Sequence, residues 1–317
     1  MNFKFKFYIS LNFIIYIWIY NLTFKDSKDL KDLKVCLCSI GKKENLYARE
    51  FVEHYKSYRI DKIFIYDNND INDEKFEEVI NDYINIKFVE IINIRGLKSP
   101  QIKMYNHCYK NNKLIYDWFI FFDMDEFIFL NNIYNIKSFL IQKKFNKCQR
   151  IQLNWVMHSD NNKIYYENKS LFERFPEREN NIRGKIVGGQ QGIKSIIRGN
   201  LNINITCPHI INKCLISCDG FGRKKKIENI ITSISDLKYY YIDHFYSKST
   251  EEFINKLFKG SVSDINAFNK SNLIPKLNRI KVYFSISKIT LLKIQYIENK
   301  THINLSYYKN NINNILL

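Results

Sequence analysis

The chain has 317 residues, 45% of them hydrophobic, and a formal net charge of +17. This hydrophobic content is enough for a sizeable core and excludes a wholly disordered chain. A strongly basic surface would suit a nucleic acid, an anionic lipid or a phosphorylated ligand. The sequence has neither zinc-finger spacing nor an RNA-recognition signature, so we expect no nucleic-acid partner and interpret most of the charge as a solvated, lysine-rich surface.

The N-terminal segment begins with basic residues and continues as an apolar stretch. Lys4 and Lys6 precede an apolar stretch that ends near Phe24, which is close to the ~20 residues that a membrane-spanning helix needs. We expect residues 1–24 to form a signal anchor and residues 25–34 a polar linker, so that the following domain is membrane-associated and lies in a secretory lumen. The alternatives are an amphipathic surface helix, a helix packed on the domain, and a bacterial or viral protein that works at the cytoplasmic face.

From residue 35 onward, apolar runs alternate with amphipathic segments. The apolar runs predict buried strands, and segments with apolar residues three and four apart predict helices. Strands that alternate with helices at this spacing predict an α/β domain with a mostly parallel, Rossmann-like sheet flanked by helices. We place this single domain at residues 35–260 and a basic C-terminal extension at 261–317. The expected strands are residues 35–40, 62–66, 86–92, 118–122, 150–157 and 239–245, and the expected helices are residues 45–59, 76–84, 250–259 and one that begins at Pro100.

Polar residues follow three of these strands, at the edge where parallel sheets bind ligands. One such segment contains Asp123 and Asp125, two carboxylates at i and i+2 that point the same way when the backbone is extended. Such a pair suits Mn²⁺ or Mg²⁺, which prefer oxygen ligands and would stabilise a departing diphosphate. The alternatives are a solvated acidic turn and a haloacid-dehalogenase-type phosphatase, although that class has Gly where Glu126 stands here and places its motif after the first strand.

Several segments resemble glycosyltransferase family 92 and the related family-2-like transferases, which have the GT-A fold. They occur in the family's order over about residues 35–260, and their combination is more specific than any one of them. The matching segments are residues 36–69, residues 101–130, Trp155, LFERF at 171–175, KSIIR at 194–198 and HFYSKS at 244–249.

The resemblance implies a role for each matching position. Asp123 and Asp125 are similar to the family's metal and diphosphate anchors. His244 is similar to a late histidine that completes the metal site, and Lys248 would pair with the diphosphate. From the residues alone, His244 would be a core histidine on a strand and Asp67 a turn residue. The residues implied to hold the nucleoside or to line the donor site are Gly41, Glu44, Asp67, Asn68 and Gln101.

The family resemblance also implies inversion at the sugar carbon, which requires a carboxylate to deprotonate the acceptor hydroxyl. Two candidates remain open. Asp160 lies in a loop after the Trp155 strand, where some relatives have Gly-Asp-Asn-Gly and this chain has lost both glycines. Glu173 is the second candidate, with an ion pair to Arg174 as its structural alternative.

A cluster of cysteine and histidine residues lies later in the chain. Its members do not have the paired spacing of zinc sites, so we expect buried thiols rather than a metal, and the redox compartment stays open. His209 either faces an acceptor pocket or has a structural role. The members of the cluster are Cys207, His209, Cys214 and Cys218.

These observations predict a metal-dependent enzyme that moves a hexose, with galactose as the choice by family analogy, from a nucleotide diphosphate sugar to a hydroxyl of a glycan or glycoconjugate. The main alternative is a membrane-anchored, non-catalytic protein that keeps the fold and binds glycans or anionic lipid. The phosphatase is the lesser alternative.

Overall fold

The computed structural model describes residues 32–178, 192–212, 215–225, 239–258 and 288–301. The expected anchor at 1–24, most of the linker, Cys214 and much of the basic extension lie outside these residues. Within the described part of the chain, no helix combines the length and apolar character that crossing a membrane requires.

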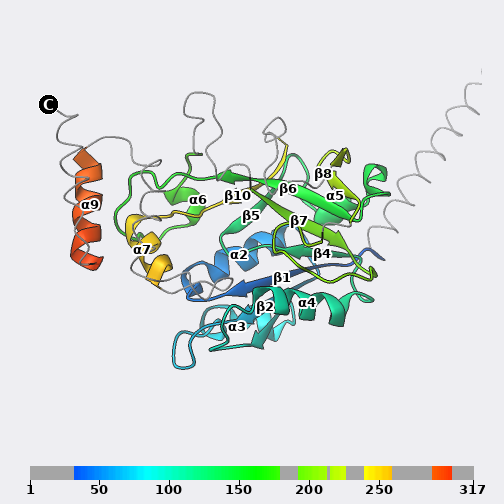
Figure 1. Cartoon of the computed structure of the whole chain (residues 1–317), viewed down its shortest axis with the longest axis horizontal. Coiled ribbons are helices and arrows are strands. Elements are labelled where there is room, and N and C mark those ends of the chain that lie inside the picture. Colours follow the sequence, from blue (N-terminus) through cyan, green and yellow to red (C-terminus); the bar gives the residue numbers. More distant parts are fainter. Residues whose placement is uncertain (1–31, 179–191, 213–214, 226–238, 259–287, 302–317) are drawn as a thin grey trace, which may run out of the picture.

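Among the described residues, ten strands form one sheet, in which eight follow the order β3-β2-β1-β4-β7-β6-β10-β5 (Figure 1). β1 to β4 run parallel to one another. β7 is antiparallel to both of its neighbours, and β5 is antiparallel to β10. The strands are β1 (Val35–Gly41), β2 (Lys62–Asp67), β3 (Val89–Asn93), β4 (Trp118–Phe121), β5 (Glu126–Leu130), β6 (Arg150–Met157), β7 (Ile193–Arg198), β8 (Ser217–Asp219), β9 (Lys224–Lys225) and β10 (Tyr240–His244).

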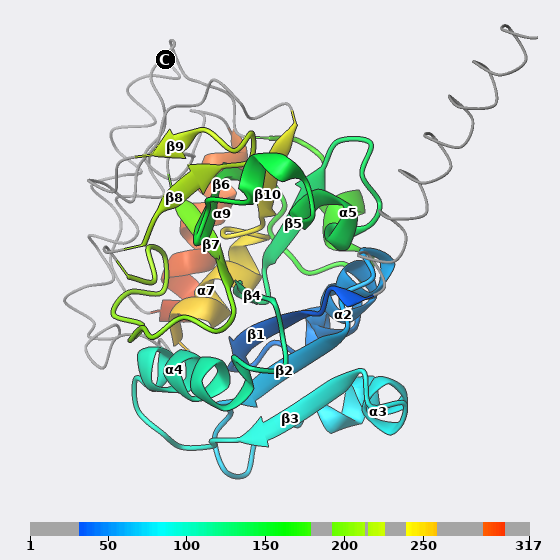
Figure 2. The same cartoon turned by 90° about the vertical axis from the view of Figure 1, so that its right-hand side faces the viewer.

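Different helices cover the two faces of the parallel half of the sheet. Along β1, Val35 and Leu37 pack into the core under α2 and α3, whereas Cys36 and Cys38 pack into the core under α4. Figure 2 shows α2 and α3 on one side of β1 to β3 and α4 on the other. Two covered faces explain why β1 and β4 are apolar without alternation and buried along their whole length. The helices are α2 (Asn45–Ser57), α3 (Glu77–Asn85), α4 (Gln101–Asn112), α5 (Ile136–Leu140), η1 (Lys143–Phe145), α6 (Leu171–Arg174), α7 (Thr250–Phe258) and α9 (Lys288–Thr301).

The predicted fold class, an α/β domain with a mostly parallel sheet between helices, is confirmed. The third strand starts later than expected, at Val89, because Lys87 has a positive φ of 61° that ends the preceding helix and turns the chain. Four strands of the second half, β5, β7, β8 and β9, were not among the expected elements. β5 and β7 add antiparallel pairing beside the parallel strands, and both approach the segment that follows β4.

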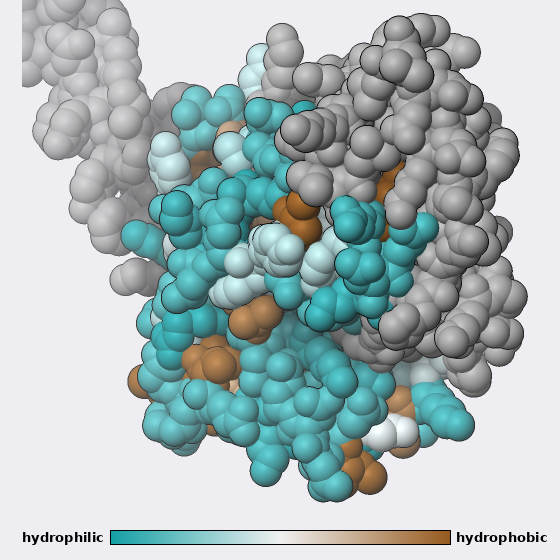
Figure 3. All heavy atoms as spheres, turned by 90° about the vertical axis from the view of Figure 1, so that its left-hand side faces the viewer, coloured by the Kyte–Doolittle hydropathy of each residue, from teal (hydrophilic) through white to brown (hydrophobic). Residues whose placement is uncertain are grey.

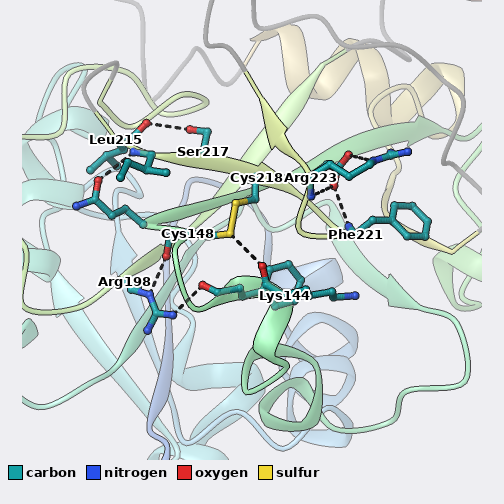
Figure 4. The surroundings of a disulfide bond; sticks show 12 residues. Lys144, Cys148, Arg198, Leu215, Ser217, Cys218, Phe221 and Arg223 are labelled. Carbon is teal, nitrogen blue, oxygen red and sulfur yellow. Dashed lines mark hydrogen bonds and ion pairs between the residues drawn. A yellow bond between two sulfur atoms is a disulfide. The ribbon is translucent and has the colours of Figure 1, made fainter.

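Two disulfides join elements that lie 70 residues apart in sequence, where buried thiols were expected. Cys38 of β1 is bonded to Cys108 of α4, and Cys148 is bonded to Cys218 of β8. In Figure 4 the guanidinium of Arg198 donates to the carbonyl of Cys148, at 2.7 Å, and so braces the second bridge. Bridges that close loops of this length stabilise a fold by about 4 kcal/mol in the chain-entropy model.

Candidate active site

Three carboxylates gather where a short connection leads from β4 into the first residue of β5. The connection is a turn in which the backbone N–H of Glu126 donates to the carbonyl of Asp123 at 3.1 Å. The carboxylate of Glu126 in turn accepts the backbone N–H of Asp123 at 3.0 Å. This reciprocal pairing folds the Asp123 to Glu126 segment into a compact acidic turn at the carboxyl end of β4, where the sequence predicted a ligand site.

Asp123 faces groups from α4 and β7. Its Oδ2 accepts from Lys194 Nζ at 2.8 Å, and its Oδ1 accepts from Gln101 at 3.1 Å and Tyr105 at 3.3 Å. Burial would raise the pKa of Asp123, but the ammonium of Lys194 outweighs burial and lowers that pKa. With 34% of its side chain exposed, Asp123 is the carboxylate of this turn that remains open to solvent.

Asp125 is buried and surrounded by cations. Lys256 Nζ lies 2.6 Å and Lys248 Nζ 3.7 Å from its Oδ2, and His244 Nε2 lies 3.5 Å from its Oδ1. Burial would raise the pKa of Asp125, yet Lys256, followed by Lys248 and His244, holds it well below its usual range. The cations around Asp125 therefore favour its ionised form.

Glu126 behaves differently from the two aspartates. Its side chain has no exposed surface, and its Oε1 has no hydrogen-bond partner among the described residues. Burial raises the pKa of Glu126 well above its ordinary value, and Asp123 and Asp125 raise it further, while Lys194 at 3.5 Å opposes them. A buried acceptor without a partner is uncommon in folded proteins and indicates a place for an additional ligand.

The residues at this turn fit a divalent cation. Asp125, Glu126 and His244 each offer a ligand atom within 4.8 Å of the others. His244 Nδ1 is buried without a hydrogen-bond partner in the described part of the chain, as is Glu126 Oε1. Burial lowers the pKa of His244, which favours the neutral imidazole that can bind a metal. This group contains Asp125 and His244, two of the three ligands predicted from the sequence. The third predicted ligand, Asp123, faces Lys194 instead.

Lys248 reaches the site from the loop before α7. Its φ of 52° is unusual for a residue with a side chain. The ammonium lies 4.1 Å from the centre of the Tyr47 ring and 3.9 Å from the carboxylate of Glu44. Tyr47 also donates to Glu252 at 2.6 Å, which connects the first turn of α2 to the first turn of α7 close to Lys248.

The predicted nucleoside residues lie at the ends of β1 and β2. Asp67 is buried and accepts from Arg95 Nε at 2.9 Å, and the amide of Asn68 donates to the carbonyl of Leu97 at 2.8 Å. A side chain at Gly41 would come within 2.5 Å of Met124 and Phe76, so only glycine fits there. Beside Arg95 lies an open cavity of about 430 Å³, lined by Ile71, Lys75, Glu77, Asn93 and Arg95.

The two predicted base candidates lie in different settings. Glu173 is exposed and accepts the backbone N–H of Ser170 at 3.1 Å, which completes the capping box of α6. Asp160 lies in the turn after β6, with 14% of its side chain exposed, and forms an ion pair with Lys293 of α9. The role of each stays a prediction, but the carboxylate of Glu173 already has a local structural task.

Charged residues of the site that were not predicted include Lys194, Lys256 and, as a ligand candidate, Glu126. Lys194 belongs to the KSIIR segment. A lysine within an otherwise apolar strand is a signal that could have found it, because a buried charge needs a partner of opposite charge. Lys256 lies one helical turn after Glu252, on the same side of α7. His209 also comes near, since its ring lies 5.3 Å from that of Trp155, and burial lowers its pKa to about 4.

Comparisons with known proteins identify a family for most of the chain. The model of the family described as Glycosyltransferase family 92 matches residues 31–273. A family 92 protein of Ricinus communis is 28% identical over 112 residues, an alignment that covers 34% of this chain and 19% of the relative. The TarS protein of S. aureus has a TM-score of 0.39 at 14% identity over 79% of this chain and 72% of its own. TarS in complex with UDP-GlcNAc gives 0.37 at 14% identity, over 84% and 78%.

Proposed function

We propose that this chain, which belongs to glycosyltransferase family 92, transfers a hexose from a nucleotide diphosphate sugar to a hydroxyl of a glycan. The observation that carries the proposal is the acidic turn after β4. There Asp123 lies against the buried Lys194, and Asp125 lies against the buried Lys248 and the half-buried Lys256. Carboxylates and ammonium groups at the carboxyl edge of a sheet suit a metal ion and a diphosphate together.

Mn²⁺ or Mg²⁺ would be held by Asp125 and His244 with Glu126 in reach, and when bound it would supply Lewis-acid stabilisation of the leaving diphosphate. Lys248 and Lys256 lie on the same side of Asp125 and add positive charge where the diphosphate develops negative charge. Lys194 and Gln101 keep Asp123 fixed in the turn.

The donor nucleoside would lie along the ends of β1 and β2. Asp67, fixed by Arg95, can accept a hydrogen bond from a base or ribose. Gly41 allows Met124 and Phe76 to pack closely against the end of β1 at this edge. Asn68 and Glu44 border the same edge, and the open cavity beside Arg95 extends it.

For acceptor activation we favour Asp160 as the general base, because the carboxylate of Glu173 is engaged in the capping box of α6. A carboxylate that removes the hydroxyl proton as the sugar carbon is attacked from the opposite side accounts for inversion. Glu173 remains the second candidate, and galactose is the first donor sugar to test.

The disulfides also support a proposal about the compartment. Two disulfides in one domain support folding in an oxidising compartment, such as a secretory lumen. Mass spectrometry after alkylation of the denatured chain without reductant would test this. Cys38, Cys108, Cys148 and Cys218 should remain unmodified, and alkylation at Cys38 or Cys148 would contradict the proposal. Attachment to a membrane through residues 1–24 is part of the same proposal.

The experiment that tests the function is release of nucleoside diphosphate from a panel of nucleotide sugars, with and without Mn²⁺. We expect one donor to be used, dependence on the metal, and loss of turnover in Asp125→Asn. Asp70→Asn, an exposed carboxylate at the same sheet edge, is the matched control and should retain activity. If no donor binds or turns over in the presence of metal, the proposed function is wrong and the non-catalytic binding protein becomes the better explanation.

A further inference from the structure

We infer that Lys293 of α9 is a positioning residue that holds Asp160 in place for the reaction. The inference rests on the proposed function, because it gives Asp160 the task of accepting a proton. It assigns a role in the site to a helix that follows the residues matched by the family model, which end at residue 273.

The turn that carries Asp160 has a backbone that its sequence supports poorly. Asn161 and Asn162 have φ values of 45° and 58°, in the left-handed region that favours glycine. Asparagine tolerates this region better than most residues, and Asp160 Oδ1 accepts the backbone N–H of Asn162 at 2.9 Å. Without glycine, a turn of this shape depends on contacts from the rest of the molecule to keep it in place.

Lys293 supplies such a contact. Its ammonium donates to Asp160 Oδ2 and lies 3.3 Å from the side-chain oxygen of Asn162. The Lys293 side chain is 1% exposed. Removing a lysine from water is unfavourable unless its charge is paired, so the position of Lys293 is set by the carboxylate that it meets. One ammonium therefore connects both ends of the left-handed turn.

The remainder of α9 is packed so that Lys293 cannot simply swing away. Ile294 and Ile297 are buried, and the ring of Tyr296 meets that of Tyr165 at 5.5 Å. In Figure 1, α9 lies beside α7 at the left-hand end of the molecule. Figure 3 views that end, where the described surface is mainly hydrophilic and its hydrophobic residues form separate small patches.

The turn is coupled to the candidate metal site through the sheet. β6 runs parallel to β10 so that Met157 is paired with His244, and the backbone N–H of His158 donates to the carbonyl of His244 at 3.1 Å. Asp160 follows two residues later. Lys293 thus fixes the carboxylate of Asp160. This residue follows the end of β6, which pairs with the strand that carries His244, a candidate metal ligand. Because a carboxylate has about four lone pairs, the contacts to Asn162 and Lys293 leave it able to accept a proton from an acceptor hydroxyl.

The first test is kinetic and uses the full chain. Lys293→Met should lower kcat for sugar transfer by roughly 10- to 100-fold and leave KM for the donor unchanged, because the donor site is intact. Lys293→Arg should restore much of the loss. Lys300→Met, at an exposed position of the same helix, should have the wild-type kcat. Combining Lys293→Met with Asp160→Asn should give no further loss beyond Asp160→Asn alone.

The second test does not depend on activity. Hydrogen–deuterium exchange of residues 158–166 should be faster in Lys293→Met than in the wild type and unchanged in Lys300→Met. Unchanged exchange in a folded Lys293→Met protein, or losses that multiply in the double variant, would overturn the inference. A wild-type chain that binds and turns over no nucleotide sugar would instead refute the proposed function, while the exchange result would still decide whether Lys293 positions the turn.

Discussion

The two halves of the sheet contribute to the candidate site in different ways. The parallel half, β1 to β4, brings the acidic turn and the nucleoside edge, and each of these follows directly from a strand end. The other half brings the cations and the imidazole: Lys194 from β7, His244 from β10, and Lys248 and Lys256 from around α7.

This difference shows how an acidic site can be preserved in a fold's interior. Carboxylates that are close in sequence would repel one another, and burial would protonate them. Cations that arrive from 71 and 131 residues away keep Asp123 and Asp125 ionised. The parallel half therefore defines where the site is, and the second half determines its charge state. Four predictions separate the two contributions.

Lys194→Met should have the largest effect, because it leaves Asp123 and Glu126 without their buried partner. Breaking a buried pair from one side lowers the free energy of unfolding by about 3–5 kcal/mol. Urea unfolding at neutral pH measures the loss, and the loss should shrink in acid, where the carboxylates take up protons. Lys224→Met, on the exposed edge strand β9, is the control. A wild-type unfolding midpoint for Lys194→Met would show that the second half does not stabilise the turn.

The two disulfides allow a direct comparison, because both span 70 residues. Replacing either pair with serine should lower the free energy of unfolding by a similar amount, about 4 kcal/mol. Only the loss of Cys38–Cys108 should also reduce donor turnover, since α4 carries Gln101 and Tyr105, which fix Asp123. Equal turnover in the two double-serine proteins, measured well below their unfolding temperatures, would show that α4 needs no covalent tie to organise the site.

Lys256→Met tests the cation nearest to Asp125. We expect kcat/KM for the donor to fall by roughly 10- to 100-fold, because one charge facing the diphosphate is removed. Binding of Mn²⁺ alone, followed by electron paramagnetic resonance, should become tighter, because the ion no longer competes with an ammonium 2.6 Å from Asp125. Asn255→Ala, at an exposed neighbouring position on α7, should change neither quantity. Weaker Mn²⁺ binding in Lys256→Met would contradict the competition.

The sequence predicted the parallel half well because its signals are local. The helix expected at 45–59 is α2, at Asn45–Ser57, and the two aspartates follow the strand that was expected to precede them. Glu173 shows that a local signal was also missed: Ser170 and Glu173 have the S-x-x-E spacing of a capping box, which indicates a structural use of that carboxylate.

The second half could not be predicted to the same depth, because its contacts are long-range. In sequence, Lys194 is a basic residue at the start of an apolar strand, and nothing nearby indicates that its partner is Asp123. The periodicity of α7 places Lys256 near a buried face but does not identify Asp125 as its partner. Likewise, Cys38 and Cys108 each look like a buried thiol until β1 and α4 pack together. Antiparallel insertion of β7 between β4 and β6 brings these distant segments together, and no local pattern specifies that order.

The smallest expected effect concerns His54, which connects the halves: it lies on α2, and its Nε2 donates to the carbonyl of Ile128 in β5 at 3.0 Å. Burial lowers the pKa of His54 to about 4, against the opposing effect of that hydrogen bond. Between about pH 6.5, the ordinary value for histidine, and about pH 4, the unfolded chain therefore binds a proton that the folded chain does not. The free energy of unfolding should decrease as pH falls through this window, by about 1–2 kcal/mol, since the side chain keeps some exposed surface.

Urea unfolding of the wild type and of His54→Gln from about pH 7 to about pH 4 measures the contribution of His54. It is the difference between the two proteins in how their free energy of unfolding changes with pH. His107→Gln, at an exposed position on α4, should follow the wild type. If His54→Gln and the wild type lose stability in parallel, α2 and β5 are not coupled through this imidazole. The two halves would then be held together by the ion pairs of the site and by aromatic packing between α2 and β5, where the ring of Phe51 lies 6.0 Å from that of Phe127.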